Sequence, residues 1–189
     1  PCEGQASIDI VVEAPVEVSG GMDEICAGTS QVFTTNPNVP VTWKVTTGGS
    51  SFVSGVTTGP FSYTFTAAGT YTITATKQGG GCESNARIIK VLPIPQAPTG
   101  TISGETRVCS GRPYVYTISP VDPGMVPVWS VTNGTIQGSN AGSSVTVIFN
   151  AGASSYTVSA QNKSISSAGC LSAPTTFNVA PLDLNSITI

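Results

Sequence analysis

The chain repeats itself, and this repeat limits the possible fold more than any other feature. The segment YTITA, which begins at Tyr71, returns as YTVSA at Tyr156. Each copy is followed by a polar turn and then by a Gly-Cys pair, at Cys82 and at Cys170. The spacing of the matched cysteines gives a unit of about 83–88 residues. A period of this size predicts two small domains of one kind in series.

The same alignment extends over the whole chain and predicts its domain boundaries. ICAGTSQVF matches VCSGRPYVY, VTWKVTT matches PVWSVTN, and the opening PCEGQASIDIVV matches GCESNARIIKVL. LPIPQAP, with three prolines, has the composition of a stiff linker. We therefore expect the tail of a preceding repeat at 1–12, one repeat at 13–92, a Pro-rich linker at 93–97, a second repeat at 98–181, and a linker or the start of a further repeat at 182–189.

Composition indicates an all-β protein. Only 9% of the 189 residues are charged, and Ser and Thr together supply 48. Gly and Pro add 21 and 14 residues, while Leu, Glu and Lys are scarce. Thr favours strands, Gly, Pro and Ser favour turns, and the scarce residues are good helix formers.

Runs of alternating apolar and polar residues predict about seven strands in each unit. They lie near 14–18, 30–35, 41–46, 51–54, 60–66, 69–77 and 84–92, and near 98–103, 113–118, 127–132, 135–137, 143–149, 154–162 and 173–180. Seven short strands separated by turns are typical of an immunoglobulin-like sandwich of two sheets. The predicted fold is two tandem Ig-like β-sandwich domains.

Four aromatic residues are predicted to anchor the two cores. Trp43 and Trp129 recur at one repeat position between β-branched neighbours, and Tyr71 and Tyr156 recur at another. An exposed indole would instead suit stacking against a sugar ring. Repetition of both pairs in a strand context favours the core.

A third aromatic group is ambiguous on pattern alone. Phe61, Tyr63 and Phe65 share one face of a predicted strand, which would be a sticky or sugar-binding strip if it pointed outward. Val145, Val147 and Phe149 stand at the matching place in the second unit, which favours burial.

The cysteines predict one disulfide per domain, Cys26–Cys82 and Cys109–Cys170, each clamping one end of a sandwich. Domains this small gain from a staple, and closing loops of 56 and 61 residues would contribute about 4 kcal/mol each in the chain-entropy model. Cys2 would be left unpaired because the sequence lacks the first half of its repeat; a reactive thiol is the alternative. Metal binding is disfavoured because no two cysteines have ligand spacing. Disulfides imply an extracellular, cell-surface location.

Several functions are disfavoured by composition. The chain has no histidine, its seven Lys and Arg residues are scattered, and its net charge is −3. Catalytic triads, imidazole-bearing metal sites and nucleic-acid binding are therefore not expected, and neither is a cofactor. No apolar run reaches the length of a membrane span, so membrane insertion is not expected either. We predict a monomer that is not an enzyme.

Calcium at a domain junction is a weaker alternative, since it would need convergent carboxylates. The first junction offers acidic residues at Asp9, Glu13, Glu17, Asp23 and Glu24. The second junction has only Glu105, so the pattern does not repeat.

The sequence contains residues that suit two kinds of covalent modification. Asn133 and Asn162 each begin an N-glycosylation acceptor triplet, although the Asn133-Gly134 pair is explained more simply as a hairpin turn. Lysines that could form Lys–Asn isopeptide bonds need a buried lysine beside a carboxylate. Lys44, Lys77, Lys90 and Lys163 lack an acidic partner in the predicted strand cores.

The order Cys-x-Gly, Trp-x-Val, Tyr-x-(Ile/Val)-x-Ala and Gly-Cys resembles the PKD-like, Ig-like repeats of very large surface proteins of Bacteroidota, and the resemblance covers residues 1–181. After Trp43 and Trp129 the chain has KVTTGG and SVTNGT in place of the Phe-Gly-Asp-Gly of the familiar PKD signature. The resemblance implies export by type IX secretion and, for some members, mobile adhesins for gliding. We therefore expect a non-catalytic spacer or adhesive stalk. Its expected partners are flanking repeats and, for an adhesive stalk, surface polysaccharide or a solid substrate. A pair of carbohydrate-binding modules from a secreted hydrolase is the alternative.

Overall fold

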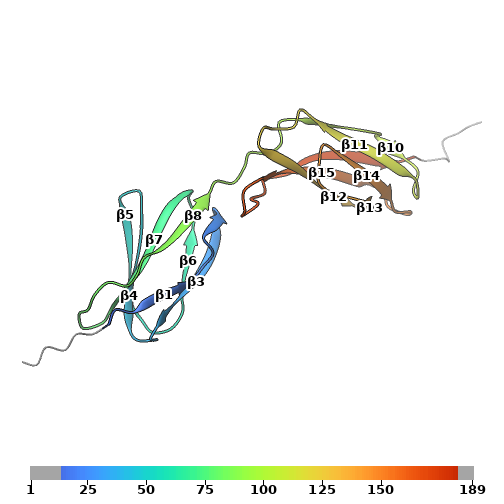
Figure 1. The fold of residues 1–189 in the computed structure, drawn as a ribbon. Coiled ribbons are helices and arrows are strands. Elements are labelled where there is room, and N and C mark those ends of the chain that lie inside the picture. The colour runs from blue at the N-terminus through green and yellow to red at the C-terminus, as the bar shows by residue number, and fades with distance from the viewer. Residues whose placement is uncertain (1–13, 183–189) are drawn as a thin grey trace, which may run out of the picture. The chain divides into compact units, whose positions relative to one another are not determined.

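The computed structural model describes residues 14–182, which form two compact units divided at Val91 and Leu92. Every regular element in this range is a β-strand (Figure 1). No helix that could span a membrane occurs among these residues. The chain is thus all-β, with two β-sandwich domains as predicted.

Unit 1 is a sandwich of a three-stranded and a five-stranded sheet. The first sheet has the order β1-β3-β6 and the second the order β2-β8-β7-β4-β5. The strands are β1 (Glu17–Gly20), β2 (Glu24–Cys26), β3 (Thr29–Asn36), β4 (Val41–Thr47), β5 (Ser50–Thr57), β6 (Phe61–Phe65), β7 (Gly69–Lys77) and β8 (Arg87–Leu92).

Unit 2 contains two four-stranded sheets, of order β13-β14-β11-β9 and β10-β16-β15-β12. Its strands are β9 (Thr101–Ser103), β10 (Arg107–Val108), β11 (Pro113–Ser119), β12 (Met125–Thr132), β13 (Gly134–Gln137), β14 (Ser144–Phe149), β15 (Tyr156–Ser164) and β16 (Thr175–Pro181). Each unit therefore has one described strand more than the alternation predicted.

The additional strands are β2 and β10, the shortest in their units. β10 pairs in parallel with β16, and in unit 1 Lys90 N donates to Asp23 O at 2.8 Å beside β2. Both strands follow a first strand that belongs to the opposite sheet, so the chain changes sheet between them. Two or three residues are too few to show an alternating pattern, which is why the sequence did not predict them.

The two repeats differ in how one edge strand is placed. In unit 1, Gly48 and Gly49 both have positive φ and join β4 to β5 as a tight hairpin within one sheet. In unit 2, Asn133 takes φ 60° at the same point, but β13 then pairs with β14 in the other sheet. The predicted Asn-Gly turn is therefore present, whereas the predicted hairpin is wrong because the chain crosses between sheets there.

Each sandwich has its own aromatic core. Trp43, Phe33 and Phe65 are fully buried in unit 1, as are Trp129, Tyr116 and Phe149 in unit 2. Burial of such large side chains supplies most of the stabilisation of domains this small.

The repeated tyrosines close a corner in each unit. Tyr71 and Tyr156 are buried, and their hydroxyls donate to the carbonyl oxygens of Ala67 at 3.0 Å and Asn150 at 2.8 Å. Such a bond ties the start of a strand to the loop before it, as in the tyrosine corner of immunoglobulin-like domains. The repeated Tyr position thus has a structural role in both units.

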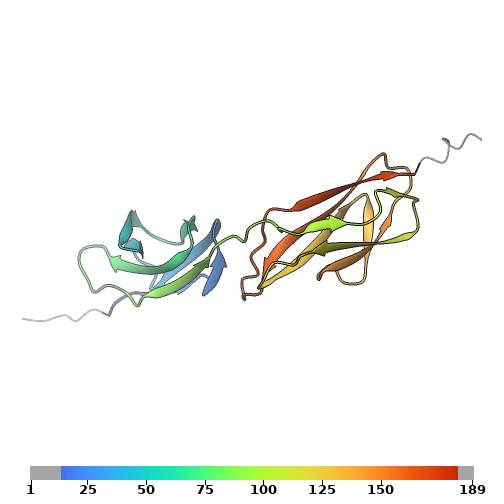
Figure 2. The same cartoon turned by 90° about the horizontal axis from the view of Figure 1, so that it is seen from above.

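Each unit receives the chain at one end and releases it at the other (Figure 2). In unit 1, Glu17 at the start of β1 pairs with Asn36, whereas Val91 near the end of β8 pairs with Gly69 at the opposite end. Unit 2 has the same arrangement. A domain of this kind can be added to a chain in series.

Candidate functional site

The cysteines depart from the prediction. Cys26 and Cys170 are disulfide-bonded, whereas Cys82 and Cys109 carry free thiols. The predicted bridges Cys26–Cys82 and Cys109–Cys170 are therefore wrong, and so is the expectation of one disulfide in each domain. Cys2 lies outside the described residues.

Strand direction explains why the predicted bridges cannot form. Cys26 ends β2, and Gly28 N donates to Phe65 O at 2.7 Å, just before β7 begins at Gly69. Cys82 follows the other end of β7, beyond Lys77. A nine-residue strand is roughly 26 Å long, whereas a disulfide needs Cα atoms within about 7 Å.

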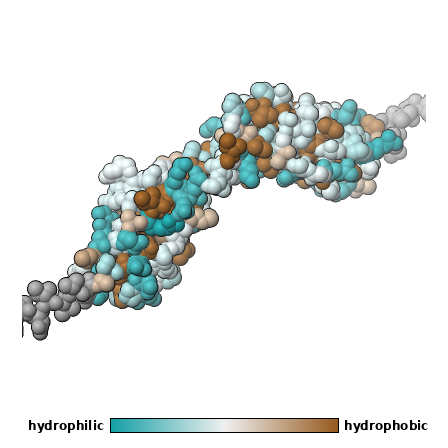
Figure 3. Space-filling model, viewed as in Figure 1, coloured by the Kyte–Doolittle hydropathy of each residue, from teal (hydrophilic) through white to brown (hydrophobic). Residues whose placement is uncertain are grey.

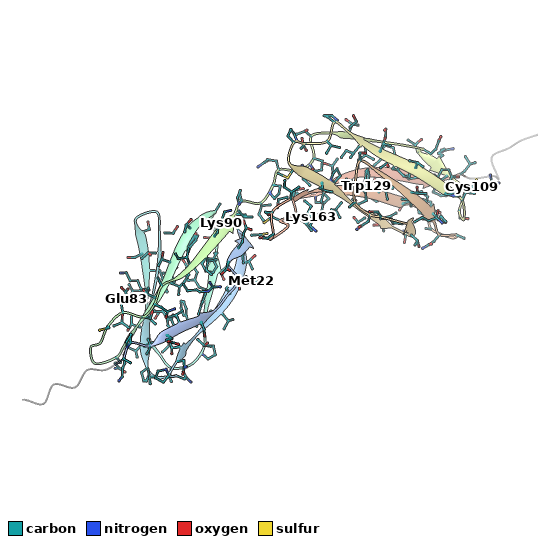
Figure 4. The ribbon with its side chains drawn as sticks, viewed as in Figure 1. Met22, Glu83, Lys90, Cys109, Trp129 and Lys163 are labelled. Atoms are coloured by element: carbon teal, nitrogen blue, oxygen red, sulfur yellow. The ribbon has the colours of Figure 1, made fainter. Side chains whose placement is uncertain are left out.

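The same separation exists in unit 2. Figure 4 shows Cys109 at one end of unit 2 and Lys163, close to Cys170 in the fold, at the other. Leu171, the residue after Cys170, forms an isolated bridge with Lys163 near the end of β15. Each sandwich thus presents one cysteine at each end.

A hollow accompanies the free thiol of unit 2. Cys109, Arg112, Tyr156 and Leu182 are among the residues that line a space of about 870 Å³ at this end of the sandwich. The Cys109 backbone N–H donates to the Tyr114 hydroxyl at 2.8 Å, which fixes the turn that carries the thiol. This end of unit 2 therefore has a free thiol beside a hollow.

A polar cluster secures the start of unit 2. The Asp122 carboxylate accepts hydrogen bonds from Thr99 N at 3.0 Å, from the Thr99 hydroxyl and from Asn162 Nδ2. The same nitrogen donates to Gln96 O at 3.1 Å. The Thr99 and Asn162 hydrogen bonds, in that order, hold the pKa of Asp122 below its ordinary value. The cluster therefore attaches residues before β9 to the body of the sandwich.

The two glycosylation triplets differ in accessibility. Asn162 is only 3% exposed and its amide nitrogen is occupied in the cluster around Asp122, so a folded unit 2 does not present it to an enzyme. Asn133 is exposed, and its Nδ2 donates to Ser155 O at 3.0 Å.

The lysines and acidic residues form surface ion pairs. Lys44 lies 3.8 Å from Glu83, Lys90 lies 3.1 Å from Glu24, and Arg87 contacts Asp23. Lys44, Lys90 and Lys163 are exposed and Lys77 is half-buried, so none has the buried setting that an isopeptide bond needs.

The acidic residues considered as calcium ligands do not form a metal-binding cluster. Among residues 14–182, no group of three or more His, Cys, Asp or Glu side chains could hold a metal ion. Asp23 and Glu24 instead face the cationic side chains of Arg87 and Lys90, and Glu17 and Glu105 belong to no such group. Asp9 and Glu13 lie outside the described residues.

Aromatic rings reach the surface of unit 1 along the edge between its sheets. Phe65 is fully buried, Phe61 and Tyr63 are partly buried against the core, and Phe52 on β5 is 47% exposed. Phe61 stacks on Trp43 with centroids 5.1 Å apart, and Phe52 follows at 6.4 Å from Phe61. This aromatic edge (Phe52, Phe61, Tyr63) is continuous with the core.

The rest of the described surface has no comparable aromatic group. In the view of Figure 3, brown apolar patches are separated by white and teal areas on both units. In unit 2, Val145, Val147 and Phe149 at the matching strand are all buried. The aromatic edge is thus a feature of one repeat and not of the repeat pattern.

Comparison with known proteins agrees with the sandwich fold. Residues 95–176 match the family model described as a PKD-like domain. No curated protein sequence matches the chain.

Several solved structures are similar to this chain at low identity. The chicken CNTN1 FN1–FN3 domains are 16% identical with a TM-score of 0.53, over 91% of this chain and 68% of that one. The fibronectin(III)-like modules of Clostridium thermocellum CbhA are 14% identical with a TM-score of 0.49, over 91% and 97% of the two chains. The C-terminal fragment of intimin, solved with the Tir intimin-binding domain, is 15% identical with a TM-score of 0.44, over 89% and 64%. The CNTN1 domains support the fold of two β-sandwich domains.

Proposed function

We propose that this chain is a non-catalytic spacer segment of a large extracellular surface protein. Its repeats extend the chain and bear mechanical tension. The observation that supports this most is the passage of the chain through each sandwich from one end to the opposite end. Domains with this topology lengthen a chain in proportion to their number, as stalks require.

Features of the side chains agree with this role. The two units share their buried Trp and Tyr positions, whereas the aromatic edge occurs in unit 1 only. Residues repeated for packing serve the fold, and a repeated binding site would need repeated exposed residues. The disulfide-bonded Cys26 and Cys170 support an oxidising, extracellular location.

The finer role is an adhesin stalk, with gliding adhesins exported by the type IX route as the specific case. This part of the proposal rests on the resemblance of the repeat pattern and on the PKD-like match of residues 95–176. Flanking repeats of the same kind are its expected partners.

Carbohydrate binding is the second candidate because of Phe52. Its ring is half exposed and backed by Phe61, which is a suitable platform for the apolar face of a sugar. The buried Trp43 and Trp129 cannot take part, so a binding site would depend on this one edge.

The test is binding of the oxidised 189-residue chain to a panel of polysaccharides and to hydrophilic and hydrophobic surfaces, with and without calcium. The spacer proposal expects no saturable binding by a chain that circular dichroism shows to be folded. Saturable polysaccharide binding that Phe52→Ala abolishes would overturn it in favour of the second candidate. Ser51→Ala, an exposed change on the same strand, is the matched control.

A further inference from the structure

The two units differ in how their sheet edges are covered. In unit 2, β14 lies between β11 and β13, and residues 139–142 run along the outer side of β12. Val128 forms an isolated bridge with Ala141 there, and Trp129 N donates to Asn140 O at 2.7 Å. Both β12 and β14 therefore have a neighbour along each side.

The corresponding edges of unit 1 are open. Within residues 14–182, β5 ends one sheet and β6 ends the other, and β5 stands at the margin of the unit in Figure 1. The Phe52 ring on β5 lies 6.4 Å from Phe61 and 5.7 Å from Tyr63 on β6, measured between centroids. The two edge strands thus border the same side of the sandwich. The outward N–H and C=O groups of an edge strand can pair with a further strand.

The β5 strand lacks the charges that usually protect such an edge. Its sequence is SSFVSGVT, and its exposed side chains include Phe52, Val53 and Val56, at 47%, 57% and 51%. No charged residue occurs between Lys44 and Lys77, so β6 is uncharged as well. Natural sheets commonly place Lys or Pro on an edge strand or cover it. An uncharged, partly apolar edge is suited to pairing with another strand.

A bulge limits the part of β5 that can pair. The register between β4 and β5 shifts between Thr42 and Lys44, and Trp43 N donates to Ser54 Oγ at 2.9 Å. The regular ladder of β5 next to its turn is therefore residues 50–53. Because a bulge interrupts pairing, this short segment favours one defined contact over extended aggregation.

Alternation along the ladder identifies the outward-facing backbone groups. Trp43 N faces β5, so the backbone of Val45, two residues further on, faces β5 as well. Val45 pairs with Phe52, whose N–H and C=O groups therefore point toward β4. The neighbouring Ser51 and Val53 then point their N–H and C=O groups away from the sheet.

We propose that this edge of unit 1 binds a second copy of itself through antiparallel pairing of the two β5 strands. A two-fold axis at Phe52 places Ser51 of each copy opposite Val53 of the other, and each such pair exchanges both of its backbone hydrogen bonds. Phe52 then lies opposite Phe52 of the second copy, in the closely spaced position where side chains contact each other. This register uses both outward-facing residues of the regular segment.

Two features favour a second copy over another partner. The strand is complementary to itself, because its outward-facing residues lie symmetrically on either side of Phe52. The edge is uncharged although the chain has a net charge of −3, so two copies approach through this side without opposing like charges. A charged peptide or polysaccharide would find no opposite charge on it.

The association is weak and reversible. Pairing of one short strand with a few aromatic side chains buries less surface than the roughly 1,200 Å² at the lower end of stable interfaces. We therefore expect a dimer at high protein concentration, which departs from the monomer expected from the sequence. The inference goes beyond the spacer role and does not depend on it. In a spacer, such pairing would join neighbouring stalks side by side.

Charges placed at the two-fold axis test the proposal. Phe52→Lys and Phe52→Glu each put like charges opposite each other, so each variant alone should stay monomeric. An equimolar mixture of the two puts opposite charges together and should form a mixed dimer. Free thiols are alkylated first so that no disulfide links two chains, and circular dichroism shows whether each variant is folded. Sedimentation equilibrium from about 10 µM to about 1 mM gives the dissociation constants.

The unchanged chain should dimerise within this range. The dissociation constant of each variant alone should be at least about tenfold higher, and that of the mixture should fall again. Val32→Lys is the matched control, because Val32 is 52% exposed but lies on β3, in the middle of its sheet. This variant should dimerise as the unchanged chain does.

An unchanged chain that is monomeric at about 1 mM would overturn the proposal, and so would a dimer that both Phe52 variants retain. A mixture that stays monomeric while the unchanged chain dimerises would refute pairing about Phe52.

A second measurement on the unchanged chain does not depend on the folding of any variant. The amide hydrogens of Ser51 and Val53 should exchange more slowly at about 1 mM than at about 10 µM, because pairing protects them. Equal exchange rates at the two concentrations would contradict the proposal. None of these measurements includes a sugar, so polysaccharide binding would refute the spacer role and leave the pairing of β5 as it is.

Discussion

Asn162 donates a hydrogen bond from its side-chain Nδ2 to the Asp122 carboxylate over 2.7 Å, although the two residues are on different parts of unit 2. The same nitrogen reaches Gln96 O, in the segment between β8 and β9. A buried asparagine thus links that segment to the end of β15.

Asn162→Ala should lower the free energy of unfolding of unit 2 by about 1–3 kcal/mol, because it removes two hydrogen bonds from a buried site. Denaturant unfolding in a Trp43→Phe background checks this, since Trp129 is then the sole tryptophan and reports on unit 2. Asn178→Ala, an exposed change on β16, is the control and should have little effect. Equal stability of the two variants would contradict the role given to Asn162.

The Asp122 carboxylate should make unit 2 sensitive to acid. Hydrogen bonds from Thr99 and Asn162 lower its pKa in the folded state. Stabilisation from this group is therefore present above the unfolded pKa of about 4, and it is lost as the pH falls through the lower folded value.

In Asp122→Ala, the dependence of the unfolding midpoint on pH should be shallower than in the unchanged protein between about pH 5 and pH 2. Glu17→Gln, which removes a carboxylate from unit 1, is the control and should leave the unit 2 curve unchanged. The same pH dependence of the unfolding midpoint in the Asp122 variant and in the unchanged protein would show that the hydrogen bonds do not lower the pKa of Asp122.

The two core tryptophans should respond differently to the same substitution. Trp129 Nε1 donates to Gly142 O at 2.8 Å, whereas Trp43 Nε1 is buried without a hydrogen-bond partner. Trp129→Phe leaves that carbonyl without its donor, whereas Trp43→Phe removes an unsatisfied group.

The loss of stability should therefore be larger for Trp129→Phe by about 1–2 kcal/mol. Hydrogen exchange, measured on peptides from each unit, gives the loss of stability of unit 1 in Trp43→Phe and of unit 2 in Trp129→Phe. A larger loss in unit 1 would mean that packing volume and not hydrogen bonding decides the cost.

Gly104→Ala should destabilise unit 2 by about 1–3 kcal/mol through overpacking. An added Cβ would lie 2.3 Å from Tyr116 Cδ1, and this ring is fully buried with its hydroxyl bonded to Glu105 O at 2.8 Å. Burial raises the pKa of Tyr116 to about 12, with smaller contributions from Glu105 and Tyr114, so its hydroxyl stays protonated as a donor at neutral pH.

Gly55→Ala is the matched control, since an added Cβ there meets nothing within 4 Å. Thermal unfolding followed for each unit measures the loss of stability in Gly104→Ala and in Gly55→Ala. A Gly104 variant as stable as the Gly55 variant would show that the Tyr116 ring can move aside at no cost.

The sequence by itself determined the repeat, most strands and the buried aromatic positions. Alternation is a local property, so β7 and β15 could be located from the residues around Tyr71 and Tyr156 alone. The burial of Trp43 and Trp129 followed from their β-branched neighbours in the same way.

Tertiary structure alone decided that the predicted cysteine pairs do not form. Repetition showed that Cys26 and Cys82 belong to one unit, but the direction of β7 places them at opposite ends of it. It also decided which sheet receives the strand after Asn133, and that Asn162 is buried against Asp122. These features depend on contacts between residues far apart in the chain, and local pattern carries no information about such distances.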